Sequence, residues 1–277
     1  MTRPTRALPA LLLAAVSLLV TACSGAAAPS GTSATPAKTL TIGMELAYPP
    51  FETKDAAGQA TGVSVDFIKD FGAAYGYDVV IENTAWDGLI PSLQTGKVDA
   101  VISSMTITQE RSKQVTFSDP YAVAQLALLV NASSGVGVAE DLNQAGKSIA
   151  VKTGSTGDVW ATKNLPNTTV IRLADESACV TEVVQGKADA FIYDQLTIYR
   201  NQQANPDTTE AVFIPFQDPE YWGVAVKLGN TELVGQLNAF IATSKTDGEF
   251  DKLTNTYLAE EKATFDSLGF RWFFDFE

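Results

Sequence analysis

Two copies of one short motif constrain the fold of this chain more than any other feature. Gly96-Lys97-Val98-Asp99-Ala100 recurs as Gly186-Lys187-Ala188-Asp189-Ala190. Each copy follows a helical pattern and leads into a short apolar run. Glycine commonly ends a helix because it adopts the left-handed conformation without strain, and a short apolar run after it is typical of a strand. The repeat therefore predicts two similar helix–strand units in two similar halves.

Polar segments follow both apolar runs. The first run continues into Ser103 to Arg111, and the second ends in Tyr193-Asp194. Open α/β sheets bind ligands just beyond the carboxyl ends of their strands, so both segments are candidates for a site. One guanidinium and one carboxylate on two half-structures suit a zwitterion held between them. The alternative is an ordinary surface arginine and aspartate.

Strand and helix patterns alternate along the chain, which predicts α/β architecture with parallel sheets flanked by helices. We expect strands at 40–43, 78–82 and 98–102, with a helix capped by Ser64 and another at 88–94. A second alternating series begins at residue 148. The apolar run 126–130 is interpreted as the strand that leaves the first domain. The aromatic segment 265–276 is expected to dock on the body of the protein, since it would aggregate if exposed.

The first 22 residues are typical of an export signal. Arg3 and Arg6 precede an apolar stretch at 10–20 that is too short for an ordinary membrane span. Val20-Thr21-Ala22-Cys23 resembles the bacterial lipobox, so we predict lipidation of Cys23 and a flexible tether at 23–38. The alternative is a soluble secreted protein with an incidental cysteine.

Composition excludes several functions. The chain has no histidine and its formal net charge is −13. Ser/His/Asp and Cys/His catalysis therefore cannot operate, the commonest zinc ligand is missing, and nucleic acid is a poor partner. We expect no metal, no cofactor and no catalytic residue. Cys179 lies among apolar residues and is predicted to be a small core residue.

Several ordered motifs between Leu40 and about Leu258 resemble those of the family 3 extracellular solute-binding proteins, the polar amino acid receptors of bacterial ABC importers. The motifs are Tyr48-Pro49-Pro50-Phe51-Glu52, 62–66, 86–93, 96–99, 106–111, Phe117-Ser118-Asp119-Pro120-Tyr121, 186–189 and 222–227. The resemblance implies a two-lobed type II periplasmic-binding-protein fold. Each lobe would hold a mixed, mostly parallel sheet, and two crossover strands would join the lobes. On this basis we expect lobe 1 at 39–129 and 216–277, and lobe 2 at 130–215.

The resemblance also implies roles for individual residues. Arg111 would bind the α-carboxylate of a ligand, with Ser104, Thr106 and Thr156 as further donors, and Asp194 would bind the α-ammonium. Tyr48 and Trp86 would line the side-chain pocket, and Glu45 would read a polar or cationic end. Lys152 is the only nearby cation for an acidic ligand. The predicted binding residues also include the strand-end positions Ser103 and Tyr193.

These roles predict a non-enzymatic, monomeric receptor that captures a polar L-amino acid by lobe closure and delivers it to an ABC transporter permease. It would be exported and held at the outer face of the cell membrane, or in the periplasm, only by the lipid on Cys23. Two alternatives remain open. One is an enzyme on the same scaffold, similar to cyclohexadienyl or arogenate dehydratases, and the other is a ligand sensor for a membrane partner.

Overall fold

The computed structural model describes residues 37–213 and 215–276, and residues Ala37–Glu277 form one compact unit. The predicted signal, Cys23 and nearly all of the predicted tether lie outside the described residues. The unit is an α/β structure built on two five-stranded sheets. It is a two-lobed type II periplasmic-binding-protein fold, as the sequence predicts.

The first sheet has the strand order β4-β1-β5-β14-β6. Its strands are β1 (Lys38–Met44), β4 (Tyr77–Asn83), β5 (Ala100–Val101), β6 (Val115–Phe117) and β14 (Ala225–Lys227). Strand β1 pairs in parallel with β4 and β5, whereas β14 is antiparallel to β5 and β6. The helices of this lobe are α1 (Val63–Tyr75), α2 (Leu89–Thr95), α3 (Gln109–Ser112), α7 (Thr231–Ser244), α8 (Glu249–Tyr257) and α9 (Ala259–Leu268). A short hairpin joins β2 (Thr53–Lys54) to β3 (Ala60–Thr61).

The second sheet repeats the same plan in the order β10-β9-β11-β8-β12. Its strands are β8 (Leu126–Asn131), β9 (Ser148–Lys152), β10 (Thr169–Leu173), β11 (Ala190–Asp194) and β12 (Thr209–Val212). Strand β9 is parallel to β10 and β11, and β8 is antiparallel to β11 and β12. Helices α4 (Thr156–Asn164), α5 (Glu176–Val184) and α6 (Gln195–Ala204) pack on it. Single 3-10 turns occur at Trp86–Gly88 and Ala139–Leu142.

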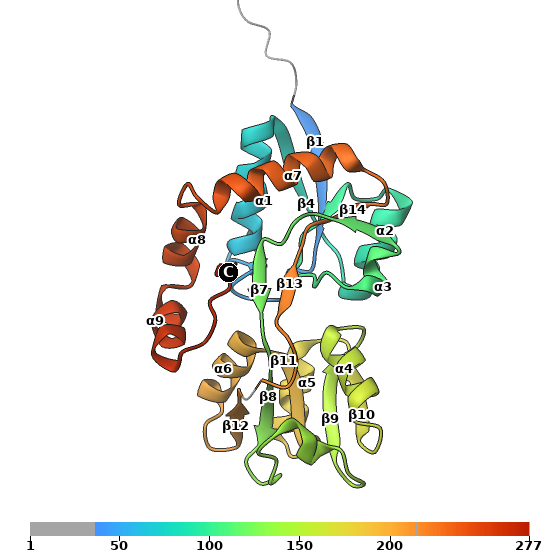
Figure 1. Cartoon of the computed structure of the whole chain (residues 1–277), viewed down its shortest axis with the longest axis vertical. Helices are drawn as coiled ribbons and strands as arrows, with labels where there is room; N and C mark the ends of the chain where they lie inside the picture. The colour runs from blue at the N-terminus through green and yellow to red at the C-terminus, as the bar shows by residue number, and fades with distance from the viewer. Residues whose placement is uncertain (1–36, 214, 277) are drawn as a thin grey trace, which may run out of the picture. The chain divides into compact units, whose positions relative to one another are not determined.

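Two short strands, β7 (Ala122–Ala124) and β13 (Glu220–Trp222), pair antiparallel between the two sheets (Figure 1). The chain passes from the first sheet to the second through β7 and returns through β13. Strand β8 follows β7, and β14 follows β13. Each of them is antiparallel to both neighbouring strands in its sheet. The sheets are mixed and mostly parallel, as predicted: in each sheet four of the five strands run in the same direction, and β14 or β8 is antiparallel to its neighbours.

The predicted boundary after residue 129 differs from the structure. Strand β8 is hydrogen-bonded to β11 and β12 and so belongs to the second sheet. Its continuous apolar pattern indicates burial on both faces, but it carries no information about which sheet buries it. Pairing with distant segments decides that assignment.

The repeated motif performs the same structural task in both lobes. Gly96 and Gly186 have φ of 77° and 69° and lie at the ends of α2 and α5, as predicted. The aspartate that follows joins the next strand to its parallel neighbour. Asp99 Oδ2 accepts from the backbone N–H of Thr41 at 2.8 Å, and Asp189 Oδ2 accepts from that of Ser148 at 2.8 Å.

The cap predicted for α1 is wrong. Gly62 with φ 126° occupies the N-cap position, and Ser64 is buried inside the first turn. A β-carbon at Gly62 would lie 2.4 Å from the carbonyl oxygen of Phe51, so only glycine fits this approach. The first N–H groups of α1 donate instead to the carbonyls of Pro50 and Phe51, at 3.1 and 2.8 Å. This contact fixes the proline-containing loop.

The C-terminal aromatic segment docks as predicted. Trp272 and Phe273 are buried in the core of the first lobe, and the backbone N–H of Val123 in β7 donates to the carbonyl of Phe273 at 2.8 Å. The ring of Phe273 packs on Phe51, with 4.9 Å between centroids. Cys179 is fully buried in the second lobe, as expected.

Candidate functional site

The predicted binding residues converge on one cavity between the two lobes. It encloses about 510 Å³ of space between protein atoms, a volume that includes its opening to solvent. Among the predicted residues, only Lys152 does not line it. The lining includes Glu45, Tyr48, Trp86, Ser103, Ser104, Thr106, Arg111, Thr156, Tyr193 and Asp194. Most of them follow the carboxyl ends of strands, as the topology requires.

Arg111 lies at one end of the cavity. Thr108 caps the short helix α3 by accepting from the backbone N–H of Arg111 at 3.1 Å. The guanidinium Nη1 donates to the carbonyl of Thr106 at 2.8 Å, and Nη2 donates to the carbonyl of Gly154, in the other lobe, at 3.2 Å. Burial lowers the pKa of Arg111, and the charge of Glu220 opposes that effect. A guanidinium has five N–H groups, so these contacts leave donors for an anion.

Glu220 links two predicted binding residues at this end. Its Oε2 atom accepts from the hydroxyl of Thr106 at 2.9 Å and from the hydroxyl of Thr156 at 2.7 Å. Its other oxygen, Oε1, accepts from the side-chain amide of Gln217 at 2.9 Å. Thr156 is the first residue of α4, and Ser155 caps that helix by accepting from the backbone N–H of Asp158.

Asp194 carries a carboxylate oxygen without a partner. Its Oδ1 atom caps α6 by accepting from the backbone N–H groups of Leu196 and Thr197, at 2.9 and 3.1 Å. Its Oδ2 atom is buried and makes no hydrogen bond. Burial raises the pKa of Asp194, although the nearby Tyr48 hydroxyl, which itself has no hydrogen-bond partner, and the two capping N–H groups oppose that rise. A buried acceptor of this kind favours a ligand that supplies a charged donor.

Lys152 forms a buried ion network behind another wall of the cavity. Its ammonium donates to Glu45 Oε2 and, at 2.8 Å, to Glu176 Oε1. The Tyr193 hydroxyl also donates to Glu176 Oε1, at 2.7 Å. Burial would lower the pKa of Lys152, but the two carboxylates outweigh burial and raise it. Burial also raises the pKa of Glu45, although Lys152 opposes that shift.

Trp86 and Tyr48 are aromatic walls of the cavity. The backbone N–H of Trp86 donates to Glu45 Oε1 at 3.1 Å. The Trp86 ring already has two cations near it, because the Arg111 guanidinium carbon lies 5.1 Å and the Lys152 nitrogen 5.4 Å from its centroid. Tyr48 packs edge-on against Tyr193, with 5.7 Å between ring centroids.

Glu52 is a fully buried carboxyl group that reaches the cavity from the proline-containing loop. Its Oε2 atom accepts from the Ser104 hydroxyl at 3.2 Å, while Oε1 has no hydrogen-bond partner. Burial raises the pKa of Glu52 to about 8, so this group is largely protonated at neutral pH. Ser104 has φ 48°, an unusual value for a residue with a side chain.

Residues 40–260 match the bacterial extracellular solute-binding proteins, family 3. The chain belongs to this family. A probable histidine-binding protein of Neisseria gonorrhoeae is 31% identical over 91% of this chain and 95% of its own length. The putative binding component of an ABC transporter from Wolinella succinogenes, solved with lysine, is 34% identical with a TM-score of 0.73, covering 79% of this chain and 95% of its own. The ancestral amino acid-binding protein AncCDT-1, described as a precursor of cyclohexadienyl dehydratase, is 36% identical with a TM-score of 0.72, covering 79% of this chain and 94% of its own.

This chain is therefore a solute-binding receptor by family, and extracellular solute-binding proteins are exported. Within the described residues, no helix is long and apolar enough to cross a membrane.

Several cavity residues of this solute-binding protein escaped the sequence analysis. They are Glu52, Ala124, Leu126, Ser155, Glu176, Glu220 and Trp222. Glu220 had a signal, because Asp218-Pro219-Glu220-Tyr221 resembles Asp119-Pro120-Tyr121 with a glutamate inserted. Glu176 had none, since it lies at the start of a helix, where a carboxylate is ordinary.

Proposed function

We propose that this protein is a non-enzymatic, extracytoplasmic receptor that captures a polar L-amino acid between its lobes and delivers it to an ABC transporter permease. The observation that carries the proposal is the charge arrangement of the cavity. Arg111 offers donors beside the Thr106 and Thr156 hydroxyls, which donate to Glu220, and Asp194 Oδ2 offers a buried acceptor on the wall formed by β11. A zwitterion satisfies both groups, which offsets the desolvation cost of enclosing its charges.

We further propose a preference for cationic or amide side chains over acidic ones. Among the described residues around the cavity, carboxylates outnumber cations: Glu45, Glu176, Asp194 and Glu220 are present with two cations, Arg111 and the buried Lys152. Lys152 is already paired with Glu45 and Glu176 and is not free for an acidic ligand. The names of related proteins agree with this preference, since they include arginine-binding proteins of Escherichia coli and Pseudomonas aeruginosa.

The amino-terminal region completes the proposed assembly. Cleavage before Cys23 and lipidation of that residue would leave the receptor, as a monomer, tethered to the outer face of the cell membrane. The supporting feature is the sequence Val20-Thr21-Ala22-Cys23 after an apolar segment. The residues after Cys23 are mostly small, a composition that suits the proposed tether between membrane and receptor.

A dehydratase is the second candidate. Two observations favour it: the likeness to a precursor of cyclohexadienyl dehydratase, and the buried carboxyl of Glu52. Its pKa of about 8 would keep a proton available for a leaving hydroxyl group at neutral pH. Incubation with prephenate and with L-arogenate, followed by ultraviolet detection of the aromatic products, tests this alternative. Turnover that disappears in Glu52→Gln would support the enzyme and count against the receptor.

Thermal unfolding of the mature protein with each common L-amino acid tests the proposed function. A ligand at a hundred times its dissociation constant adds about 2.7 kcal/mol to the free energy of unfolding. We expect the largest shift with arginine, lysine or glutamine, and no shift with any amino acid in Arg111→Ala. Tightest binding of glutamate or leucine would overturn the proposed preference, and no shift with any amino acid would overturn the receptor function.

A further inference from the structure

Glu220 lies in the part of the cavity that we assign to the ligand carboxylate. Both threonine hydroxyls proposed as ligand donors, those of Thr106 and Thr156, donate to one oxygen of Glu220 at 2.9 and 2.7 Å. The Glu220 charge also acts on the Arg111 guanidinium. A carboxylate of the chain itself therefore already occupies this set of donors.

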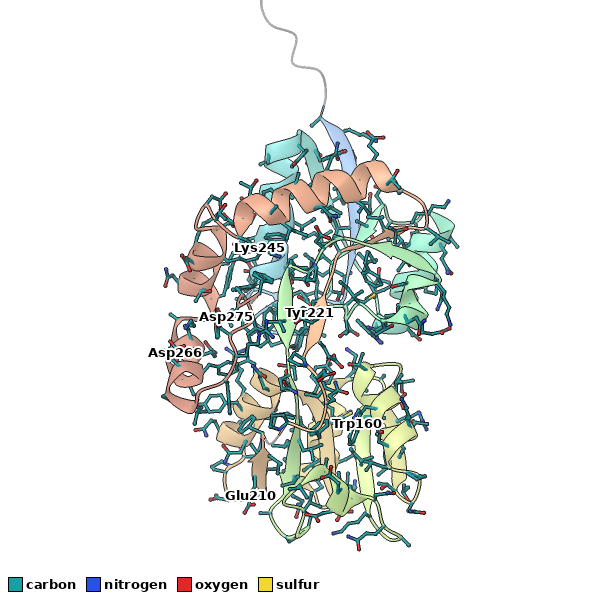
Figure 2. The ribbon with its side chains drawn as sticks, in the orientation of Figure 1. Trp160, Glu210, Tyr221, Lys245, Asp266 and Asp275 are labelled. Atoms are coloured by element: carbon teal, nitrogen blue, oxygen red, sulfur yellow. The ribbon has the colours of Figure 1, made fainter. Side chains whose placement is uncertain are left out.

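The backbone of Glu220 is fixed by the connection between the lobes. Glu220 begins β13 and pairs with Ala124 of β7, and the following residue, Tyr221, lies between the lobes in Figure 2. Thr106 follows β5 of the first lobe, and Thr156 begins α4 of the second. One carboxylate oxygen thus joins the two lobes through hydroxyl groups.

A ligand carboxylate and the Glu220 carboxylate cannot both occupy this position. Like charges at hydrogen-bond distance repel, and the two hydroxyl protons are already donated. The structure offers the Glu220 side chain a second position. A second hollow, lined by Lys163, Gln217 and Glu220 among others, opens beside the cavity along α4, where Figure 2 shows Trp160. Lys163 supplies a cation there, and Gln217 already holds the other oxygen of Glu220.

We propose that Glu220 is an internal competitor for the ligand α-carboxylate. It holds the donors of Thr106 and Thr156 in the ligand-free receptor, is displaced when a ligand binds, and thereby lowers the affinity for every ligand with a free α-carboxylate. This proposal rests on the proposed amino acid receptor function.

Calorimetry of four proteins tests it: the wild type, Glu220→Ala, Glu220→Gln and the control Glu210→Ala. Glu210 is an exposed glutamate of β12, far from Tyr221 in Figure 2. The ligands are the L-amino acid that binds the wild type most tightly, or L-arginine if none binds, and the α-carboxamide of the same compound. The carboxamide has no anion to compete with Glu220.

We expect Glu220→Ala to bind the amino acid about tenfold more tightly, the ratio that corresponds to ~1.4 kcal/mol. Glu220→Gln, which keeps an acceptor but loses the charge, should gain less. The affinity for the carboxamide should not increase in either variant. Glu210→Ala should bind both ligands with wild-type affinity.

The outcomes distinguish a failure of this proposal from a failure of the proposed receptor function on which it rests. If the wild type binds and Glu220→Ala is unchanged or weaker, the competitor proposal fails while the receptor function stands. If Glu220→Ala bound the amino acid and its α-carboxamide more weakly by the same factor, the result would show that Glu220 contacts the ligand ammonium instead. If neither the wild type nor either Glu220 variant binds any amino acid, both proposals fail.

Discussion

Arg111 and Asp194 carry opposite charges in the cavity, and each is held by backbone contacts that leave part of its side chain available. Arg111 donates to the carbonyls of Thr106 and Gly154, which orients the guanidinium plane. Asp194 uses one oxygen to cap α6 and keeps the other unpaired. These contacts with the fold set the orientation of both charged groups before a ligand binds, which reduces the entropic cost of binding.

Replacement of Arg111 should abolish amino acid binding. In Arg111→Ala the ligand carboxylate would be enclosed without a charged partner, at a cost of roughly 2 to 5 kcal/mol. Arg111→Lys should also bind poorly, because a point charge cannot reproduce paired planar donors. Titration calorimetry measures both affinities, and circular dichroism checks the fold. Wild-type affinity in both variants would remove Arg111 from the site.

Asp194→Asn should weaken ligands with an α-ammonium far more than their deaminated analogues, since only the former lose a charge partner. Asparagine is as good an N-cap as aspartate, so α6 should remain capped and the midpoint of unfolding should change little. Affinities for an amino acid and for the corresponding deaminated acid give the comparison. Equal losses for both would assign Asp194 to the fold alone.

Glu52 should make the receptor less stable as pH rises. Its pKa is about 8 in the folded protein against an ordinary value of 4.5, so the folded state binds the extra proton between these values. The free energy of unfolding should therefore fall from about pH 4.5 to about pH 8, with a slope of up to ~1.4 kcal/mol per unit. Denaturant melts of the wild type and Glu52→Gln isolate this contribution, because Glu45 and Asp194 are common to both. Parallel pH profiles of the two proteins would contradict the prediction.

At the scale of elements, the repeated Gly-Lys-x-Asp-Ala motif explains why the two lobes share a plan. Glycine ends the helix, and aspartate bonds to a backbone N–H on the neighbouring parallel strand. In the second lobe Asp189 also accepts from the ammonium of Lys147 and the hydroxyl of Ser148, at 3.2 and 3.1 Å. The motif therefore stabilises the fold. The candidate binding residues lie at the opposite ends of the same strands.

Asp189→Ala should destabilise the protein by ~1–3 kcal/mol, because the partly buried N–H of Ser148 loses its acceptor. Ligand affinity of the folded variant should stay within about twofold of the wild type, since Asp189 does not line the cavity. Asp207→Ala, at an exposed turn, is the control. Chemical denaturation gives the stability and calorimetry the affinity. A large loss of affinity without a loss of stability would place Asp189 in the binding mechanism.

At the scale of the whole molecule, polar side chains from both lobes meet around the cavity. Arg111 bonds to Gly154, Lys152 bonds to Glu45, and Glu220 bonds to threonines of both lobes. Each contact joins a residue of one lobe to a partner in the other lobe or in the connecting strand. In the receptor that we propose, opening of the lobes for ligand exchange would break these contacts, which would couple lobe opening to the occupancy of the site.

Membrane attachment should be separable from ligand binding. Cys23→Ala should move the receptor from the membrane fraction to the soluble exported fraction without changing its affinity, because Cys23 precedes the described body by a stretch of small residues. Cell fractionation and calorimetry measure the two effects. Intact-mass analysis that found an unlipidated Cys23 in the native protein would refute the anchor.

The sequence by itself determined the elements, the repeated plan and the neighbourhood of the site. Glycine caps, helical spacing and apolar runs are local signals, and strand ends of an α/β sheet form a predictable binding edge. This is why Arg111 and Asp194, 83 residues apart and each beyond the strand that follows one copy of the repeat, could be proposed for one site from the sequence.

Tertiary structure decided the polar partners inside that cavity. Lys152 and Glu45 are 107 residues apart, and Thr106 and Glu220 are 114 apart. Whether such groups meet depends on how two lobes are brought together through β7 and β13, which no local pattern records. Three features follow from long-range pairing: the direction of Lys152, the hydrogen bonds that Glu220 accepts from Thr106 and Thr156, and the membership of β8 in the second sheet. The free energy of burying a charge or a strand depends on partners that only the assembled fold supplies.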